Sequence, residues 1–324
     1  MTNKFIKNYS VSLILIIAVG AMVLYKLLPD PVEPPIVKED PLAWYPPDIY
    51  SLVNSPGSDL VLYGRELILH TAKYFGPRGS LKKISNGMNC GNCHLDAGSR
   101  PYGNSFAAVA ANYPKFRNRS GKVESVEFRI NDCFERSLNG KVLDTLSREM
   151  RAMVAYIKWL GKDVHKKIAP KGSGVPKIEI LKRAADPANG RQVYVNKCLR
   201  CHGDSGGGML SPDSTEYSYP PLWGQNSYNV SAGLYRISAL AGFVKYNMPY
   251  TITQTVPQLS DEDVWDVSAY ICSQQRPVKF FEQDWPKIET KPFDHPFGPF
   301  ADTFSGARHK YGPFNFAKNK KQGK

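Results

Sequence analysis

The sequence predicts an all-α protein with two tandem domains of similar architecture, on three observations. The motif Cys-x-x-Cys-His occurs twice, at 90–94 and 198–202, with starting points 108 residues apart (198 minus 90). Apolar residues near each motif recur at the three- and four-residue steps of amphipathic helices. A length of 324 residues suits two domains of ordinary size with extensions. We therefore expect an internal duplication, with one helical core around each motif.

Residues 1–28 have the form of an export signal or a membrane anchor. Lys4 and Lys7 precede an uncharged run from Val11 to Tyr25, which is the pattern of a secretory signal. The apolar stretch is barely long enough to cross a bilayer, and residues 29–48 read as a Pro-rich linker. We expect a periplasmic protein, and the pattern favours a retained inner-membrane anchor over a soluble periplasmic form.

The first domain is predicted at 49–165. Its first helix begins at Gly64, and a closing helix runs from Ser147 to Leu160, with Gly161 as its stop. The inner face of the closing helix is formed by Met150, Met153, Val154, Ile157 and Leu160. A linker rich in Lys, Pro and Gly follows at 166–185.

The second domain is predicted at 186–277 and repeats this order. A helix from Gly190 leads into the second motif, and a closing helix follows the N-cap Ser260, where acidic residues suit the positive end of the helix dipole. Residues 278–324 lose helical periodicity but are rich in Phe and Tyr. We expect an irregular C-terminal extension that packs across both domains.

Each Cys-x-x-Cys-His motif indicates covalent attachment of haem c. Two thiols three residues apart on one turn can both add to the vinyl groups of haem, and the next imidazole then lies beneath the iron. The sequence therefore predicts two haems in two cytochrome c-type domains, attached through Cys90, Cys93, Cys198 and Cys201, with His94 and His202 as proximal ligands. The alternative is a pair of disulfide or zinc turns, but no second cysteine pair is spaced to close a zinc site.

The formal net charge of +13 predicts a basic surface, which the haem propionates would reduce. An exported haem protein rarely meets nucleic acid, so we expect none as a partner. An anionic small substrate or an acidic redox partner fits the charge better. Part of the excess lies in the basic tail at 318–324, which needs no functional explanation.

The distal ligand of the second haem is predicted to be Met248. Between His202 and Ser260 there is no further histidine, and the methionines are Met209, which follows the motif too closely, and Met248. The Met-Pro sequence at 248–249 is common in c-type cytochromes. Lys245 is the competitor, since a neutral lysine amine can ligate ferric iron.

The first haem has an unusual ligand choice. The stretch 95–149 contains neither histidine nor methionine. Cys133 is therefore the soft ligand available there, 39 residues after His94 (133 minus 94). A thiolate on ferric haem lowers its reduction potential. Three alternatives stay open: a disulfide between Cys133 and Cys272, ligation by His70, or a five-coordinate iron.

Arginines surround Cys133 in the sequence and predict a cationic pocket. Arg117 and Arg119 lie upstream, and Arg129 and Arg136 fall on the same helical face as the cysteine. Arginine forks match oxyanions well. The alternative is that these arginines bind haem propionates or face solvent.

These residues resemble the dihaem thiosulfate dehydrogenase family. The resemblance rests on the segment 129–140, on the paired motifs, and on the aromatic tail segments 291–302 and 309–314. It implies an active-site haem held by His94 and Cys133, and an electron-transfer haem held by His202 with Met248 or a neighbouring lysine. In some members a lysine directly precedes the methionine; here Asn247 stands there, which favours permanent Met248 ligation.

The resemblance implies that two thiosulfates are coupled into tetrathionate with release of two electrons, in a reaction that related enzymes also run backwards. Arg119 and Arg129 would help to bind the dianionic substrates. We hypothesise that Cys133 also carries a thiosulfate-derived sulfur during turnover. The electron partner would be a small periplasmic cytochrome c or a quinol-linked carrier.

Three other functions compete with this interpretation. The first is a membrane-tethered dihaem electron carrier without a substrate pocket, which the missing methionine between 95 and 149 disfavours. The second is a dihaem peroxidase, which would need an acid/base pair beside an open iron site. The third is a sulfur-oxidation cytochrome that passes sulfur to a carrier protein.

Overall fold

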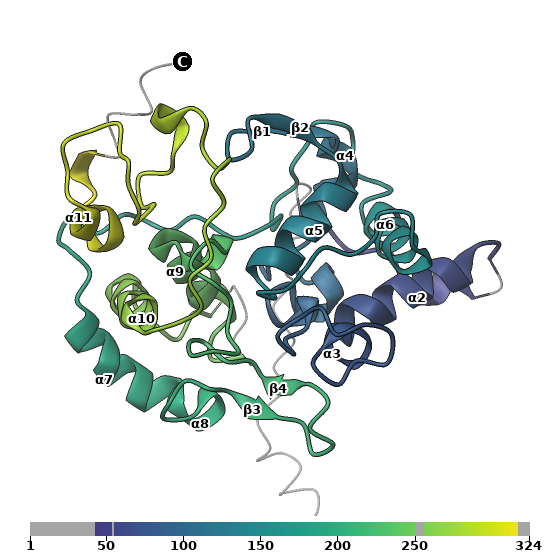
Figure 1. Ribbon diagram of the computed structural model, residues 1–324, viewed down its shortest axis with the longest axis horizontal. Helices are drawn as coiled ribbons and strands as arrows, with labels where there is room; N and C mark the ends of the chain where they lie inside the picture. The colour runs from purple at the N-terminus through teal and green to yellow at the C-terminus, as the bar shows by residue number, and fades with distance from the viewer. Residues whose placement is uncertain (1–42, 54, 251–255, 317–324) are drawn as a thin grey trace, which may run out of the picture. The chain divides into compact units, whose positions relative to one another are not determined.

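The computed structural model describes residues 43–316, except 54 and 251–255. The predicted signal or anchor at 1–28 lies outside the described residues. Among those that are described, no helix is long and apolar enough to span a membrane. Figure 1 shows two mostly helical halves with very short strands, in agreement with the predicted fold class.

The first half contains two crossed helices that frame its motif. Its elements are η1 (Ile49–Leu52), α2 (Ser58–Leu69), α3 (Thr71–Phe75), η2 (Cys90–Asn92), η3 (Leu95–Gly98), α4 (Val109–Asn112), β1 (Lys115–Arg117), β2 (Lys122–Glu124), α5 (Val126–Arg136) and α6 (Arg148–Leu160). Helix α2 packs closely on α6 because Gly64 has no side chain. A Cβ at this position would overlap the carbonyl oxygen of Ala152.

Helix α6 forms as the sequence predicts. Ser147 caps it by accepting a hydrogen bond from the N–H of Met150 at 3.2 Å, and Gly161 follows its last residue. All five residues of the expected inner face are buried. Trp44 joins this core as well, although it lies in the range predicted as the Pro-rich linker.

The second half repeats the crossing. Its elements are α7 (Pro187–Lys197), α8 (Leu199–His202), β3 (Met209–Leu210), β4 (Tyr217–Tyr219), η4 (Gly233–Tyr235), α9 (Ile237–Asn247) and α10 (Asp261–Ser273). A Cβ on Gly190 of α7 would overlap the carbonyl oxygen of Asp266 on α10. Ser260 and Asp263 form a capping box at the start of α10. The matching glycines support the predicted duplication.

The two strand pairs are antiparallel hairpins. β1 pairs with β2, with Phe116 opposite Val123, and β3 pairs with β4. The loop of the second hairpin carries Glu216, whose carboxylate lies 3.0 Å from His70 Nδ1 and accepts from Asn89 Nδ2 at 3.0 Å. This hairpin therefore ties the second domain to the first.

A second set of hydrogen bonds joins the two domains near α5. The N–H of Asn229 donates to the carbonyl oxygen of Arg136 at 3.0 Å, and its Nδ2 donates to that of Glu135 at 2.8 Å. Asn86 Nδ2 donates to the carbonyl oxygen of Ser227 at 3.0 Å. The segment around 227–229 is thus held directly against the first domain.

The C-terminal extension packs across both domains, as predicted. Asp284 pairs with Arg136 of the first domain, and Phe314 contacts Trp265 of the second, with ring centroids 5.7 Å apart. The extension is not wholly irregular, since it contains η5 (Ile288–Thr290) and α11 (Gly306–Tyr311). Ser305 caps α11 by accepting a hydrogen bond from the N–H of Arg308 at 3.2 Å. This N-cap serine is a signal for a short helix, whereas amphipathic periodicity indicates only longer ones.

Candidate functional site

Each Cys-x-x-Cys-His segment folds into a single tight turn. The N–H of its histidine donates to the carbonyl oxygen of its first cysteine, from His94 to Cys90 at 2.9 Å and from His202 to Cys198 at 3.0 Å. None of the four cysteines of the two motifs forms a disulfide with another described cysteine. Each turn therefore brings two cysteine side chains and one imidazole close together in space.

The two imidazoles are held in the tautomer that a metal ligand requires. His94 Nδ1 lies 2.6 Å from the carbonyl oxygen of Asn104, and His202 Nδ1 lies 2.9 Å from that of Pro220. A carbonyl can only accept, so Nδ1 carries the proton and Nε2 keeps its lone pair. Burial lowers the pKa of His94 to about 4 and also lowers the pKa of His202, which keeps both rings neutral at pH 7.

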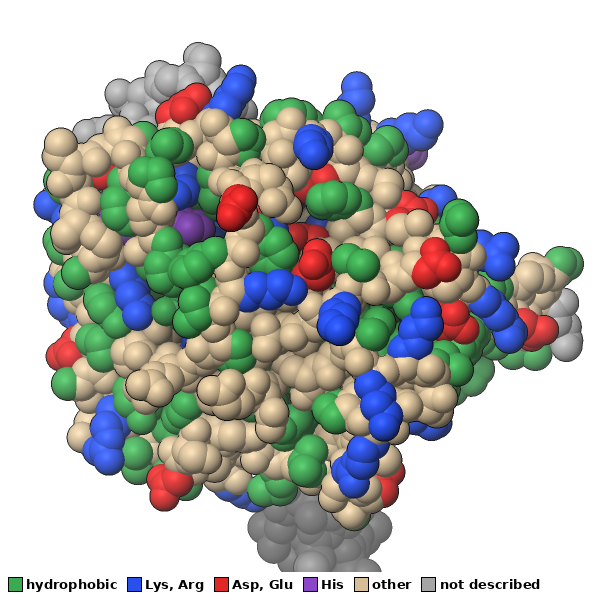
Figure 2. All heavy atoms as spheres, in the orientation of Figure 1, with side chains coloured by type: hydrophobic (Ala, Val, Ile, Leu, Met, Phe, Trp, Pro, Cys, Tyr) green, Lys and Arg blue, Asp and Glu red, His purple; other side chains and the backbone are tan. Residues whose placement is uncertain are grey.

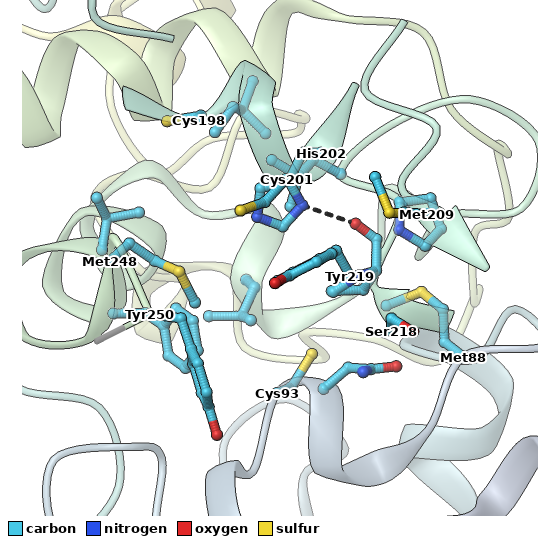
Figure 3. Close-up of a pocket in the computed structure, with 18 of the residues that line it drawn as sticks. Met88, Cys93, Cys198, Cys201, His202, Met209, Ser218, Tyr219, Met248 and Tyr250 are labelled. Atoms are coloured by element: carbon cyan, nitrogen blue, oxygen red, sulfur yellow. Dashed lines mark hydrogen bonds between the residues drawn. The ribbon is translucent and has the colours of Figure 1, made fainter. Parts of the chain in front are cut away.

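A cavity of about 640 Å³ adjoins the second turn. His202 from α8 and Met248 from the segment after α9 both line it, and Figure 3 shows them within the same pocket. Its other walls are largely apolar, with Leu222, Leu240, Phe243, Val244, Val267 and Ile271 among them. The structure thus brings the predicted proximal and distal ligands of the second site into one apolar cavity.

Lys245 is turned to other partners. Its Nζ donates to the carbonyl oxygen of Leu259 at 2.8 Å and lies 2.7 Å from the carboxylate of Asp261. Lys245 does not line the cavity beside His202. The geometry therefore favours Met248 over Lys245.

A smaller cavity of about 340 Å³ adjoins the first turn. His94 and Cys133 both line it, together with Met153 of α6. Residues Ser173 and Gly174 also line it, although they lie in the range predicted as linker. The linker therefore forms part of the wall of the first site.

Two of the three alternatives to Cys133 ligation, the disulfide and His70, are not supported by the geometry. Cys133 and Cys272 are both free thiols, and Cys272 donates instead to the carbonyl oxygen of Tyr235 at 3.2 Å. His70 Nδ1 lies 3.0 Å from the carboxylate of Glu216, and His70 does not line the first cavity. Neither a disulfide nor His70 ligation fits this arrangement.

The predicted arginines occupy two different positions. Arg129 and Arg117 line the first cavity, and Lys115 of β1 adds a third cation to it. Arg119 does not line the cavity: its guanidinium lies 3.6 Å from Asp132 and 5.6 Å from the centre of the Trp285 ring. Burial lowers the pKa of Arg119 to about 10, so the side chain stays charged at neutral pH.

Sequence reasoning missed the acidic residue at the centre of this cluster. Asp132 accepts hydrogen bonds from both Arg129 and Arg136 and faces Arg119. Its spacing of three residues from Arg129 and four from Arg136 on one helix was a usable signal. Asp284, which accepts two hydrogen bonds from Arg136 at 2.6 and 2.8 Å, gave no such signal, because it lies 148 residues away.

The face of the molecule seen in Figure 2 carries no single basic patch. Figure 2 shows Lys and Arg side chains scattered over that face, with acidic and hydrophobic groups between them. The high net charge is thus spread over the molecule there. Local positive charge at the site comes from the cavity residues themselves.

The two turns, their neutral imidazoles and the cavities that adjoin them fit covalently bound haem, and they define a c-type cytochrome. The family described as SoxA/TsdA, cytochrome c domain, matches residues 80–165, and the cytochrome c family matches residues 187–275. These matches imply covalently attached haem c.

Curated relatives identify the family. The thiosulfate dehydrogenase of Psychrobacter arcticus is 36% identical over 242 residues, which is 74% of this chain and 71% of the relative. That of Allochromatium vinosum is 37% identical over 199 residues, 60% of this chain and 72% of the relative. This chain belongs to the thiosulfate dehydrogenase family, as its sequence motifs predicted.

A solved structure agrees with this assignment. Thiosulfate dehydrogenase (TsdBA) from Marichromatium purpuratum, in its "as isolated" form, matches with a TM-score of 0.69 and 30% sequence identity. The match covers 88% of this chain and 57% of that chain. The present chain thus spans less than two thirds of that protein.

Proposed function

We propose that this protein is a thiosulfate dehydrogenase that couples two thiosulfates into tetrathionate. One observation carries the proposal: His94, Cys133 and Arg129 line the same cavity. The guanidinium of Arg129 places positive charge in the cavity that contains both predicted ligands, where an anionic substrate would meet Cys133. The names of the relatives support the same substrate.

Two haem c groups would be held by the residues already described. Cys90, Cys93 and His94 would hold the first, with Cys133 as distal ligand, and Cys198, Cys201 and His202 would hold the second, with Met248 as distal ligand. Haem bound at both turns would supply one-electron redox chemistry, enough to accept the two electrons that the coupling releases.

Cationic side chains would bind the substrate. Thiosulfate is a dianion, so two of them repel each other when they are brought together in one small cavity. Arg129, together with Arg117 and Lys115, would compensate this charge directly. Arg119 would contribute from behind, because Asp132 links it to Arg129.

Cys133 would carry the substrate sulfur covalently. Its thiolate would form an S–S bond to the outer sulfur of one thiosulfate with loss of two electrons, giving a cysteine S-thiosulfonate. The outer sulfur of the second thiosulfate would then attack that bonded sulfur, release tetrathionate and restore the thiolate. Each step conserves charge, and no proton is transferred.

The second domain would pass electrons to the acceptor. The first attachment turn, including Cys93, borders the cavity beside His202, which supports transfer from the first domain to the second. The acceptor would be a small periplasmic cytochrome c or a quinol-linked carrier. A periplasmic location, with tethering to the inner membrane through residues 1–28, follows from the sequence pattern alone.

Steady-state assays of the purified holoprotein test this proposal. We expect thiosulfate to reduce ferricyanide with tetrathionate as product, and a reduced viologen to drive the reverse reaction. A protein that does neither, yet exchanges electrons with a cytochrome, would be a carrier and would refute the proposal. Electron paramagnetic resonance should show distinct thiolate-bound and methionine-bound ferric haems.

The covalent role of Cys133 is tested by changing it to Met. This variant keeps a sulfur that can bind iron but cannot form the S-thiosulfonate, so we expect loss of nearly all thiosulfate oxidation. Cys272→Ser serves as the matched control. Cys272 forms no disulfide, and its thiol donates a hydrogen bond to the carbonyl oxygen of Tyr235 in the second domain. Full activity in Cys133→Met would rule out the covalent role.

A further inference from the structure

A buried guanidinium lies beside the second cavity with two nitrogens unpaired. Arg276 follows α10 and is only 6% exposed. Its Nη2 donates to the carbonyl oxygen of Ile271 at 2.6 Å. Its Nε and Nη1 are buried and have no hydrogen-bond partner among the described residues.

A buried hydroxyl next to this guanidinium is unpaired as well. Tyr228 is 3% exposed, its Oη makes no hydrogen bond of ordinary geometry with the described residues, and the cation beside it is the guanidinium of Arg276. The guanidinium of Arg276 lies 4.4 Å from the centre of the Tyr228 ring and 4.9 Å from that of Tyr235. Burial raises the pKa of Tyr228 to about 12, so the hydroxyl keeps its proton and can donate.

Three unpaired donors in one buried place imply an acceptor that the polypeptide does not supply. Each buried donor without a partner costs about 1–3 kcal/mol, and more when it carries charge. A guanidinium is best matched by a carboxylate, which accepts two hydrogen bonds in its plane. None of the ion pairs found among the described residues involves Arg276.

The position of these groups identifies the acceptor. Arg276 itself does not line the 640 Å³ cavity that His202 and Met248 share, but Tyr228 and Ile271, which it contacts, both line it. Haem c carries two propionate carboxylates. We propose that Arg276 and Tyr228 bind a propionate of the second haem and raise the reduction potential of that haem. The inference rests on the proposed occupancy of this cavity by haem.

Potentiometric titration of the holoprotein tests this inference, with the two haems distinguished by their electron paramagnetic resonance signals. A buried cation beside haem favours the ferrous state, so its removal should lower the reduction potential of that haem. The change should be smaller than the one caused by loss of an axial ligand. For Arg276→Gln we expect the reduction equilibrium constant of the second haem to fall on the order of tenfold, which is about 59 mV for one electron. The potential of the first haem should stay unchanged.

Three further variants sharpen the test. Tyr228→Phe keeps the ring and removes only the hydroxyl, so we expect a shift in the same direction but smaller. Arg276→Lys keeps the charge and should recover most of the potential. Arg191→Gln removes an exposed arginine from α7 and serves as the control, with no expected shift.

The outcomes separate this inference from the proposed function. Two haems per chain with unchanged potentials in both Arg276→Gln and Tyr228→Phe would overturn the propionate assignment alone. A shift confined to the first haem, or a wild-type potential that depends on added chloride or sulfate, would also overturn it. A single haem per chain, measured as the pyridine haemochrome, would overturn the proposed function and this inference together.

Discussion

Asn247 Nδ2 donates a hydrogen bond to the carbonyl oxygen of Tyr102 at 3.0 Å, which joins the second domain to the loop that follows the first motif. The same amide donates to the carbonyl oxygen of Phe243 at 2.9 Å, and Asn247 is only 1% exposed. The rings of Tyr102 and Tyr246 stack with centroids 5.4 Å apart. The residue directly before Met248 is therefore fixed by both domains.

The first prediction concerns this contact. Asn247→Ala removes both side-chain hydrogen bonds, including the one that joins the two domains beside Met248, so the Met248 segment should loosen. We expect the charge-transfer absorption of the methionine–ferric haem bond to weaken and to disappear at a lower temperature than in the wild type. Asn196→Ala, at an exposed position on α7, is the control. An unchanged band and melting profile in Asn247→Ala would contradict the role of the contact.

The second prediction concerns Asp132. Three arginines lose their common carboxylate in Asp132→Asn, and a buried charge left without a partner typically costs about 3 kcal/mol. We expect a free energy of unfolding lower by about that amount, together with a higher KM for thiosulfate, because Arg129 is no longer fixed. Denaturant titration and steady-state kinetics measure the two effects.

Asp284→Asn is the comparison for that prediction. Asp284 bonds only Arg136 within the cluster, and Arg136 keeps Asp132 as its second partner. The loss of stability should therefore be smaller than in Asp132→Asn, with little change in KM. Equal effects of the two changes would show that Asp132 has no special position in the cluster.

The third prediction concerns the two helix crossings. Gly64→Ala and Gly190→Ala each place a methyl group against a carbonyl oxygen of the opposite helix, Ala152 in one domain and Asp266 in the other. We expect each to lower the free energy of unfolding by about 3 kcal/mol. Gly233→Ala should be nearly neutral, because its Cβ would meet no atom within 4 Å. Thermal denaturation of the holoproteins compares the three variants.

The fourth prediction is a pH dependence of stability at Asp266. Burial alone would raise the pKa of this carboxyl, but the hydrogen bonds from Arg183, from the N–H of Asp186 and from Asn189 lower it below its ordinary 3.8. The ionised form therefore stabilises the fold. This contribution is complete above pH 3.8 and is lost as the pH falls through the lower folded-state pKa.

The wild type should accordingly be more stable than Asp266→Asn at neutral pH, and the difference should shrink as the pH falls below 3.8. Chemical denaturation over this range measures it. Glu262→Gln is the control, since Glu262 pairs with the same Arg183 but is 68% exposed, where an ion pair contributes little. A difference that grows on acidification would contradict the assigned direction of the pKa shift.

What the sequence revealed of the site depended on distance along the chain. The attachment turns and the capped closing helices are local patterns, and the structure contains them where they were expected. Cys133 emerged because no other soft ligand occurs in its stretch, and the structure places it in the cavity with His94. Arg129 follows from its place on the same helix.

Other parts of the site depend on contacts between distant residues. Asp284 reaches Arg136 from the C-terminal extension, and Ser173 reaches the first cavity from the predicted linker. No periodicity or motif links such positions, because only the folded chain brings them together. Arg119 illustrates the same limit. Its role as a cationic residue near the site was predicted, but its position on the far side of Asp132 was not.

The position of Cys93 at the rim of the second domain's cavity has a kinetic consequence. An electron passing between the two halves would travel inside one folded molecule, so its rate should not vary with protein concentration. Dilution would slow only the encounter with the external acceptor, and that encounter would set turnover at low acceptor levels.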